Sequence, residues 1–373
     1  MRVHSNIAIT SAALASSFGC STEELRANLA AERRGLSFTH RFSDRINSPL
    51  GEIPWNDLGI PIRDPSDSDS LLLQGCQAVF ARLKEKSRVF QRYPSSKLGL
   101  FVGTTTCGIS GFFDVTRELK NSGRALNSLL KADMQQAWVG RKLASEFAIH
   151  GPVYTFSSSC AASAQAFVMA HDSVRMGWVD AAIVLGVDVL NAVTLHGFDA
   201  LQLLDPNYCQ PFSEARAGIN LSEAIVAMVL EREADPSIGT RVRSYAALTE
   251  GHHMTQPAPE GVGMKRCMER ALVQAGLEPH EISYINPHGT ATLANDAGEA
   301  LAIGQIFGDT SLVHPTKRYT GHTLGASGAL ELLISSLMLE TNHSSAFQNA
   351  YALKNSFGFG GSNISIVLQR GDL

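Results

Sequence analysis

The sequence predicts an α/β fold in which two halves of similar layout follow each other along the chain. Two almost continuous apolar runs, Ala181–Val187 and Ala224–Leu230, are typical of strands buried on both faces of a sheet. A short strand at Val153–Phe156 runs into a helix over Ala161–Met176, so strands and helices alternate as in βαβ units. The same alternation returns after residue 239.

The elements of the first half follow from short apolar runs and helix-start signals. The run Ile7–Thr10 predicts a strand, and Ser21 before two glutamates opens a helix because its hydroxyl can cap free N–H groups. Four prolines make residues 40–70 loop-like. The remaining expectations for this half are a helix over Ser70–Lys86, a buried strand over Leu98–Val102 and a mainly helical stretch over 111–150.

The sequence ADPSIG at 234–239 has the composition of a linker. We therefore divide the chain into an N-terminal half, residues 1–238, and a C-terminal half, residues 239–373. In the second half, Gly276 ends a helix that begins at Gly263, because glycine readily takes the left-handed conformation after a helix. The other expected elements are strands at Val242–Leu248, Ile282–Ile285 and Ile364–Leu368, and helices at 295–306 and Leu324–Glu340.

Composition argues against several classes of protein. Of the 373 residues 18% are charged, and the formal net charge of -4 argues against a general nucleic-acid binder, which would carry a basic excess. No apolar run reaches about 18 residues, so we expect no transmembrane helix. The short apolar run at the N-terminus is interpreted as a strand rather than a signal peptide, which predicts a cytoplasmic protein. Six cysteines without a CxxC pair predict neither a disulfide framework nor a structural zinc site.

One of these cysteines, Cys160, has an unusual setting. It follows three serines at the junction of the strand 153–156 and the helix after it. A thiol there faces the unpaired N–H groups and the positive end of the helix, which predicts a lowered pKa and a nucleophilic thiolate. Ala161, Ala162 and Ser163 are small enough for a substrate to approach the sulfur. The alternative interpretation is a buried structural cysteine.

Two histidines have settings that suit a site. His288 directly follows the strand 282–285 and so lies at a strand's carboxyl end, where sites in open α/β sheets form. His322, in GHTLGASG, directly precedes a helix. Both are flanked by glycine, which permits tight turns and close ligand approach. The alternative for each is a histidine held by local hydrogen bonds. The adjacent His252 and His253 have no obvious third metal ligand.

These three residue types suit a reaction that moves an acyl group and then forms a carbon–carbon bond. A thiolate can take an acyl group as a thioester. A malonyl unit that loses carbon dioxide becomes an enolate, and its oxygen needs hydrogen-bond donors. Two imidazoles can donate through Nε2 and stabilise that charge.

Four sequence blocks follow one another along the chain: SSSCAASAQA (157–166), NPHGTATLANDAGEA (286–300), PTKRYTGHTLGASGALE (315–331) and NSFGFGGSN (355–363). Together they resemble the β-ketoacyl-ACP synthases of the Cys-His-His class, and the resemblance extends over nearly the whole chain. It implies the thiolase fold, a duplicated αβαβα arrangement of layers with two mixed sheets.

The resemblance also implies the roles of the catalytic residues. Cys160 would be the acylated nucleophile, and His288 and His322 would bind the malonyl thioester and promote its decarboxylation. Lys317 matches the lysine that organises the site, and Glu331 matches a buried glutamate bonded to it. A structural ion pair between these two is the alternative. Phe359 matches a gating phenylalanine whose N–H, with that of Cys160, would form the oxyanion hole.

Four further residues are candidates for substrate binding. Thr290 and Thr292 match the threonines that hydrogen-bond the pantetheine arm, and Phe212 matches a phenylalanine beside the nucleophile. Phe198 is a candidate for the acyl pocket. No metal or redox cofactor is implied, because the phosphopantetheine is carried by the acyl carrier protein.

The chain also departs from the family's pattern. Ser213 stands where an acidic residue usually follows Pro-Phe, and the segment 222–226 (SEAIV) keeps little of a glycine-rich block. These departures favour a specialised system, such as polyketide or aryl-polyene synthesis, over housekeeping fatty-acid elongation. They also leave open a non-catalytic subunit like a chain-length factor, although such partners usually lack the cysteine. A thiolase would need a second cysteine near the C-terminus, where the last is Cys267, and His322 disfavours the Cys-His-Asn class.

The expected function is therefore condensation of an acyl thioester with malonyl-ACP to give 3-ketoacyl-ACP. The expected partners are acyl-ACP, malonyl-ACP and a second subunit, in a homodimer or in a heterodimer with a related ketosynthase subunit. The carrier protein is acidic, so a basic docking patch is expected. Its two candidates are Lys120, Arg124 and Lys131, or Arg82, Lys84, Lys86 and Arg88, although a solvated helix face explains either cluster equally well.

Overall fold

The computed structural model describes residues 6–42, 46–62, 68–109, 111, 119, 135–232, 239–308, 312–341 and 351–371. Its strands are β1 (Ile7–Ser16), β2 (Leu98–Gly103), β3 (Val153–Phe156), β4 (Ala181–Asp188), β5 (Ala224–Arg232), β6 (Thr240–Thr249), β7 (Ile282–Asn286), β8 (Tyr351–Gly358) and β9 (Ser362–Gln369). Its α-helices are α1 (Thr22–Ala30), α2 (Ser68–Lys86), α3 (Val89–Arg92), α5 (Trp138–Glu146), α6 (Ala162–Arg175), α7 (Ala192–Ala200), α8 (Val262–Ala275), α9 (Leu293–Phe307), α10 (Lys317–Thr320) and α11 (Ser327–Thr341). Short 3₁₀ turns lie at Trp55–Leu58, Ser95–Lys97, Ser159–Ala161, Pro259–Gly261, Pro279–Glu281 and Leu324–Ala326.

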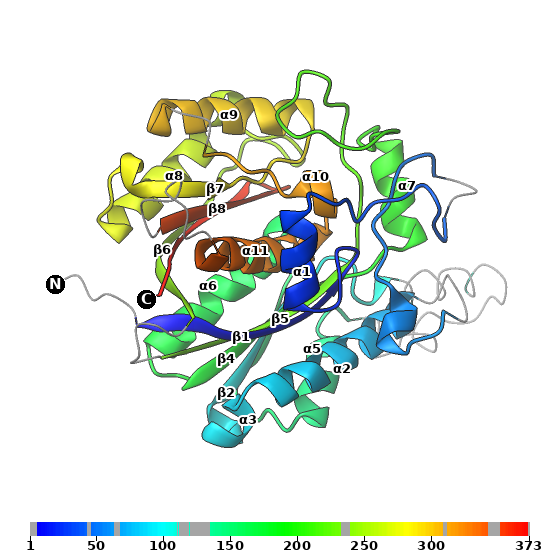
Figure 1. The fold of residues 1–373 in the computed structure, drawn as a ribbon, viewed down its shortest axis with the longest axis vertical. Coiled ribbons are helices and arrows are strands. Elements are labelled where there is room, and N and C mark those ends of the chain that lie inside the picture. Colours follow the sequence, from blue (N-terminus) through cyan, green and yellow to red (C-terminus); the bar gives the residue numbers. More distant parts are fainter. Residues whose placement is uncertain are drawn as a thin grey trace.

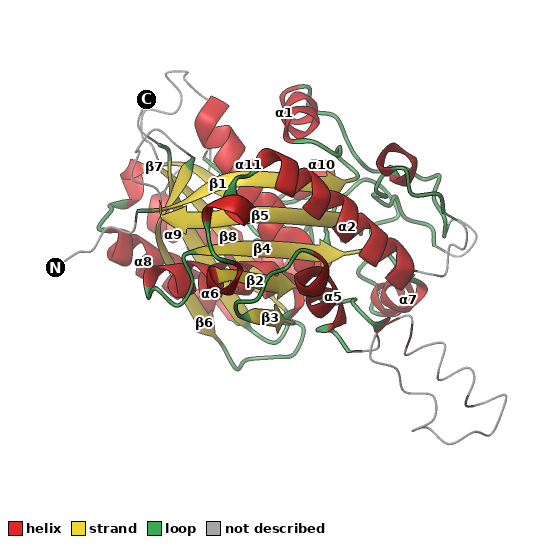
Figure 2. Ribbon diagram, turned by 90° about the horizontal axis from the view of Figure 1, so that it is seen from below, coloured by secondary structure: helices red, strands yellow, loops and turns green. Residues whose placement is uncertain are grey.

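The strands form two mixed sheet regions that meet at one seam. The strand order is β3-β2-β4-β5-β1-β6-β9-β8-β7, and the seam between β1 and β6 is only two residue pairs long, Ala8 with Arg241 and Ile9 with Thr240. The predicted two mixed sheets are therefore hydrogen-bonded into one continuous sheet. Because the seam is short, the two regions fold over each other and enclose a helical layer (Figures 1 and 2).

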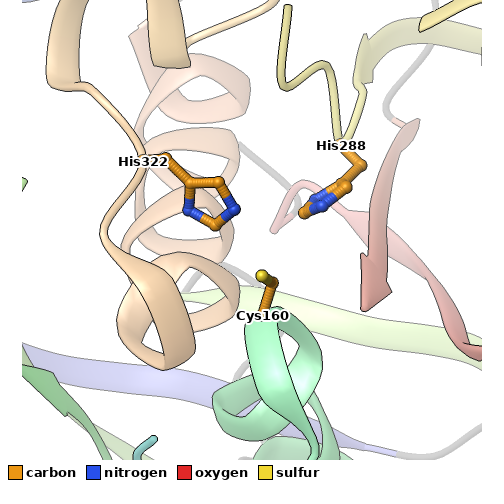
Figure 3. A group of neighbouring side chains, drawn as sticks. All are labelled: Cys160, His288 and His322. Carbon is orange, nitrogen blue, oxygen red and sulfur yellow. The ribbon is translucent and has the colours of Figure 1, made fainter. Parts of the chain in front are cut away.

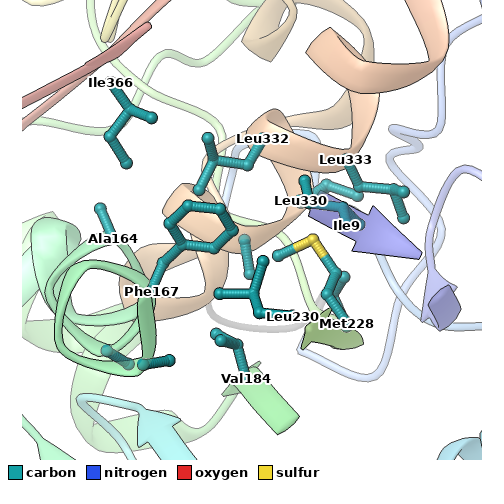
Figure 4. Packing of buried hydrophobic residues seen from close by; sticks show 14 of the residues in the cluster. Ile9, Ala164, Phe167, Val184, Met228, Leu230, Leu330, Leu332, Leu333 and Ile366 are labelled. Carbon is teal, nitrogen blue, oxygen red and sulfur yellow. The ribbon is translucent and has the colours of Figure 1, made fainter. Parts of the chain in front are cut away.

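Five layers result, as the predicted fold requires. Helices α6 and α11 contact each other and fill the space between the two sheet regions (Figure 1). Helices α2 and α5 cover the outer face of the first region, and α8, with α9 beside it, covers the outer face of the second. The central layer is apolar: Phe167 of α6 and Leu332 of α11 meet Met228 and Ile366 from the two sheet regions (Figure 4). Burial of such side chains stabilises the fold by about 25 cal/mol per Å² of apolar surface.

The duplication is visible in the topology. In the first half β2 is parallel to β4, and β4, β5 and β1 are antiparallel neighbours. In the second half β7 is parallel to β8, and β8, β9 and β6 are antiparallel neighbours in the same order. Each central helix follows a 3₁₀ turn whose first residue has a left-handed φ, 52° at Ser159 and 52° at Leu324. When the two halves are aligned on these turns, Gly325 takes the position in the second half that is equivalent to Cys160 in the first.

Several sequence predictions differ from the structure. Strand β1 extends to Ser16, because its alternating small residues continue to pair with β5. Strand β8 was not predicted, since Lys354 and Asn355 interrupt its apolar pattern, and α7 was also missed. Of the stretch 111–150, predicted to be mainly helical, the described part contains α5. The end of α8 is confirmed: Gly276 has a φ of 69°. Among the described residues, no helix is long and apolar enough to cross a membrane.

Candidate active site

Cys160 lies in the tight turn between β3 and α6. The turn Ser159–Ala161 starts in the left-handed region, which bends the chain from the strand into the helix. The Cys160 side chain is buried and points from the start of α6 towards two imidazoles (Figure 3). The predicted place of the sulfur at a strand–helix junction is confirmed.

The pKa predicted for this thiol is wrong for the substrate-free protein. Burial raises the pKa of Cys160 to about 11, and the Lys317 ammonium and the backbone N–H of Cys160 oppose the shift only in part. Loss of water around the sulfur therefore outweighs the favourable end of the helix. The resting group is a neutral thiol.

Cys160, His288 and His322 converge from three separate segments. The cysteine sulfur and one nitrogen of each imidazole all lie within 4.8 Å of one another. The two imidazole centroids are 5.5 Å apart and the ring planes are nearly perpendicular, at 88° (Figure 3). Both histidines are buried. A single thioester group can therefore reach all three side chains.

The backbone around each histidine is held by hydrogen bonds. The N–H groups of His288 and Gly289 donate to the two carboxylate oxygens of Glu299 on α9, each at 2.8 Å. The N–H of His322 donates to the carbonyl of Asn220 at 2.7 Å, and the carbonyl of His322 accepts the N–H of Ser222 at 3.0 Å. The first histidine is thus fixed from α9 and the second from the segment before β5.

Hydrogen bonding also sets the tautomer of both rings. The Leu324 N–H donates to His322 Nδ1 at 3.1 Å, and Lys317 Nζ, which can only donate, lies 3.4 Å from His288 Nδ1. Since both Nδ1 atoms accept, the proton of each neutral ring sits on Nε2. Burial, reinforced by Lys317, lowers the pKa of both imidazoles well below their usual range. The two rings are therefore neutral Nε2–H donors.

A cysteine and two histidines this close could also bind a metal ion. A histidine that ligates a metal through Nε2 usually donates its Nδ1–H to a carboxylate or carbonyl. Here the Nδ1 atoms of His288 and His322 face donors instead, which leaves no lone pair on Nε2. The arrangement therefore fits hydrogen-bond donation to a substrate better than metal ligation.

A buried chain of charges lies behind His288. Lys317 Nζ is 2.5 Å from Glu331 Oε1 and donates to the His288 carbonyl at 2.5 Å. The ion pair predicted between Lys317 and Glu331 is therefore present. A second lysine, missed by the sequence analysis, completes the chain: Lys354 Nζ is 2.6 Å from Glu331 Oε2.

A cavity of about 430 Å³ opens onto the three converging side chains. Four other residues proposed from the sequence line it: Thr290, Thr292, Phe198 and Phe359. The two threonine hydroxyls are hydrogen-bonded to each other at 2.9 Å. Phe212 is not among the lining residues. Its ring lies against Gly289, where an added Cβ would meet it at 3.0 Å.

The turn that carries Phe359 touches the turn that carries Cys160. A Cβ added to Gly358 would lie 3.0 Å from the Ser158 carbonyl oxygen and 3.1 Å from the Ala161 nitrogen. Both distances are shorter than ordinary Cβ contacts, so a side chain at position 358 would push the two turns apart by a few tenths of an ångström. The glycine therefore brings the backbone of the Phe359 turn close to the backbone of the nucleophile's turn.

Two buried carboxylates that organise the site were missed. Glu299 accepts hydrogen bonds from the loop of His288. The sequence feature that could have identified it is an acidic residue on an apolar helix, eleven positions after the histidine. Asp188, at the end of β4, accepts hydrogen bonds from Thr104, Thr105 and Thr106 and, at 2.6 Å, from the N–H of Gly325. It ties the end of β2 to the turn that leads into α11. No local sequence signal marks it, because its partners come from two segments that are distant in the sequence.

The departures at 222–226 leave this geometry intact. The Ser222 side chain packs between two glycines: a Cβ at Gly51 would meet its hydroxyl at 2.1 Å, and one at Gly321 would meet its Cβ at 2.9 Å. Glu223 accepts the N–H groups of Ile53 and Leu190 and pairs with Arg41. The other departure, Ser213, accepts the N–H of Ala215 within its own turn.

The comparisons with known proteins agree with this geometry. Residues 59–236 match the family model described as "Beta-ketoacyl synthase, N-terminal domain", and residues 240–350 match "Beta-ketoacyl synthase, C-terminal domain". This chain belongs to the β-ketoacyl synthase family. It is accordingly an acyltransferase of the condensing type, with the predicted thiolase-like fold.

Individual relatives support the same assignment. The β-ketoacyl synthase is 28% identical over 317 residues to "3-oxoacyl-[acyl-carrier-protein] synthase 2" of Staphylococcus aureus (strain COL), covering 74% of this chain and 76% of the relative. It is 31% identical over 304 residues to the chloroplastic "3-oxoacyl-[acyl-carrier-protein] synthase I" of Arabidopsis thaliana, covering 72% of this chain and 64% of that one. Among solved structures, the ketosynthase ApeO in complex with its chain length factor ApeC, from Xenorhabdus doucetiae, has a TM-score of 0.82 and 28% identity, with 98% of each chain covered.

Proposed function

We propose that this synthase condenses an acyl group on Cys160 with malonyl-ACP, releasing carbon dioxide and 3-ketoacyl-ACP. The observation that carries the proposal is the convergence of one thiol and two Nε2–H imidazoles on a single cavity. A thiol is the group that accepts an acyl chain, and two neutral donors are the groups that an enolate requires.

In the first step, the Cys160 sulfur attacks the carbonyl carbon of acyl-ACP. A carbon–sulfur bond forms to Cys160, the bond to the carrier's sulfur breaks, and the thiol proton ends on the departing carrier thiolate. Because one thiol replaces another, no net proton acceptor is needed. The N–H groups of Cys160 and Phe359 would bind the oxyanion, and the close approach at Gly358 supports this assignment.

In the second step, His288 and His322 donate through Nε2 to the carbonyl of the malonyl thioester. The bond to the carboxylate breaks, carbon dioxide leaves, and the electron pair passes to the enolate. The enolate carbon then attacks the acyl carbonyl on Cys160, a carbon–carbon bond forms as the bond between the acyl carbon and the Cys160 sulfur breaks, and the released cysteine thiolate takes a proton from water. Lys317 and Glu331 hold His288 in place.

Apart from the water that supplies one proton, all groups in this scheme belong to the chain or to its two thioester substrates. The reaction therefore requires no metal or redox cofactor of the protein's own, and phosphopantetheine arrives on the acyl carrier protein. Thr290 and Thr292, at the cavity wall, would bind the pantetheine arm, and Phe198 would line the acyl pocket. A role for Phe212 in substrate binding would be indirect, through the loop at Gly289.

Acyl carrier protein is the proposed partner. Of the two basic clusters predicted to bind it, Lys120, Arg124 and Lys131 lie outside the described residues. The other lies on or just after α2, where Arg82 donates to the Cys20 carbonyl and Lys86 pairs with Glu23. The choice between specialised polyketide-type synthesis and fatty-acid synthesis rests on the departures at Ser213 and 222–226.

We further propose a dimer that forms through β3. This strand ends the sheet order, and Tyr154 on it is half exposed. An edge strand presents unpaired backbone groups that a second subunit can pair with. The ApeO relative was solved with its chain length factor, so both a homodimer and a heterodimer are arrangements to test, by measuring the mass in solution with and without Tyr154→Lys.

The proposed division of the chain at 238/239 is supported by the start of β6 at Thr240 and by the family matches on either side. A cytoplasmic location remains a prediction from the sequence.

Intact-mass analysis tests the proposed chemistry. Incubation with acyl-ACP should add one acyl mass, which Cys160→Ala abolishes, and malonyl-ACP should then yield 3-ketoacyl-ACP. Cys160→Ala should still release carbon dioxide from malonyl-ACP, because both imidazole donors remain, whereas His288→Ala should not. A folded protein that never becomes acylated, alone or with a partner, would favour the non-catalytic subunit instead.

A further inference from the structure

Lys354 is buried beside the active site on a strand that the sequence analysis missed. Neighbours on β8 face opposite sides: Ala352 packs in the layer of α6 and α11, whereas Leu353 and Phe357 pack towards α8. Lys354 shares the face of Ala352, so its side chain enters the central layer close to Glu331 of α11. The residue is 1% exposed.

The contacts of Lys354 are all with groups of the site or of its own strand. Its Nζ lies 2.6 Å from Glu331 Oε2 and donates to the Ser356 hydroxyl at 2.8 Å and to the carbonyl of Asn355. Glu331 uses its other oxygen, Oε1, for Lys317. Each oxygen of the carboxylate thus has its own ammonium, and Lys317 reaches on to His288.

Burying a second ammonium costs free energy, because the charged group loses its hydration. Lys317 and Glu331 already form a neutral pair, so Lys354 adds a second ammonium to this buried cluster. Bringing an ion into such a site costs free energy that its partners must compensate. The neighbouring residues on this face of β8, Ala352 and Ser356, carry no charge. The extra charge lies behind His288, which lines the cavity in which the proposed reaction develops negative charge.

We propose that Lys354 is a positioning residue for decarboxylation. It fixes Glu331 so that Lys317 stays against His288, and its positive charge favours the enolate. This inference rests on the proposed function, and it assigns to Lys354 a role through Glu331 and Lys317 rather than contact with the substrate.

The charged groups around Lys354 agree with this role. Glu331 faces it from α11, Lys317 from α10 and Glu299 from α9. Burial lowers the pKa of Lys354 to about 8, against the opposing effect of Glu331. Its positive charge in turn helps to lower the pKa of His288 and His322. Below about pH 8 the ammonium is charged and pairs with Glu331, and above that pH the charge is lost.

The test is the pH profile of malonyl-ACP decarboxylation in the full-length protein, measured as carbon dioxide release. The wild type should lose activity above about pH 8. Lys354→Met should release carbon dioxide roughly tenfold more slowly at pH 7, as when partners that orient a functional side chain are removed. The loss of activity above pH 8 should disappear in this variant, and the loss of activity on the acidic side should begin at a higher pH, because the pKa values of the imidazoles rise.

Ser356→Ala is the matched control, because it removes the hydroxyl partner of Lys354 on the same strand and keeps the charge. Ser356→Ala should keep the wild-type pH profile on both its acidic and its alkaline side. Lys354→Arg should restore part of the rate of carbon dioxide release at pH 7. If Lys354→Met does not fold, as judged by circular dichroism, Lys354→Gln replaces it with the same expectations. NMR titration of the imidazoles gives a readout independent of turnover: the pKa of both should rise in the variant.

Two results are distinguishable. A wild type that releases no carbon dioxide from malonyl-ACP overturns the proposed function itself. If the wild type releases carbon dioxide, the comparison with a folded Lys354→Met variant decides this inference. A variant with the same pH profile on both sides and the same imidazole pKa values as the wild type would leave Lys354 with a structural role only and would overturn the inference.

Discussion

The rings of Phe198 and Phe359 stack at the cavity, with centroids 6.2 Å apart and planes inclined by 24°. Phe198 comes from α7 in the first half of the chain, and Phe359 from the turn after β8 in the second. Because Gly358 brings that turn against the nucleophile's turn, the ring contact connects α7 to the immediate surroundings of Cys160.

Replacing Phe198 should change which acyl groups load onto Cys160. Phe198→Ala removes a ring from the cavity wall, so bulkier or longer acyl chains should gain about tenfold in kcat/KM relative to acetyl, the scale on which pockets discriminate small apolar groups. Acylation rates measured by intact mass with a panel of acyl-ACPs check this. Leu201→Ala, at an exposed lining residue, is the control, and an unchanged preference in Phe198→Ala would contradict the assignment.

The reactivity of Cys160 should increase with pH. Since burial raises the pKa of its thiol to about 11, the thiolate fraction grows about tenfold per unit between pH 7 and pH 10. Iodoacetamide alkylation, read by mass spectrometry and corrected with Cys160→Ala for the other cysteines, should follow this slope. A rate that is already level at pH 7 would show a low pKa and would support the expectation from the sequence instead.

Glu299→Gln should reduce activity more than it reduces stability. Both oxygens of Glu299 accept N–H groups, from His288 and Gly289, and an amide would turn its NH2 towards one of these donors. A buried donor without an acceptor costs about 1–3 kcal/mol, so the loop of His288 should shift and kcat for condensation should fall about 5- to 100-fold. Glu269→Gln, at an exposed residue of α8, is the control and should retain the wild-type rate.

Asp188→Asn should lower the free energy of unfolding by about 2 to 4 kcal/mol. The aspartate accepts from three consecutive threonines and from Gly325, and asparagine replaces one acceptor oxygen with a donor. Urea denaturation measures the change. Thr105→Val removes a single hydroxyl donor and should cost about 1 kcal/mol. Equal stability of Asp188→Asn and wild type would show that these hydrogen bonds contribute nothing net.

The local sequence predicted most of the elements that carry the site. The apolar runs at Ala181–Val187 and Ala224–Leu230 became β4 and β5, and the serines before Cys160 became the turn into α6. The apolar pattern did not predict a strand where polar residues are buried in it. Strand β8 was missed because it contains Lys354 and Asn355, whose burial depends on partners from α11 and α9. Glu299 and Asp188 were missed for the same reason.

The sequence by itself determined the residue types of the reaction, because a cysteine after a strand and glycine-flanked histidines are local patterns. Only the tertiary structure decided that these side chains meet, that both imidazoles carry their proton on Nε2, and that the thiol is neutral at rest. Those properties depend on burial and on donors from distant segments, such as Lys317 beside His288 and the N–H of Leu324 beside His322. Desolvation is set by the whole fold, so no local pattern around Cys160 could reveal the direction in which its pKa moves.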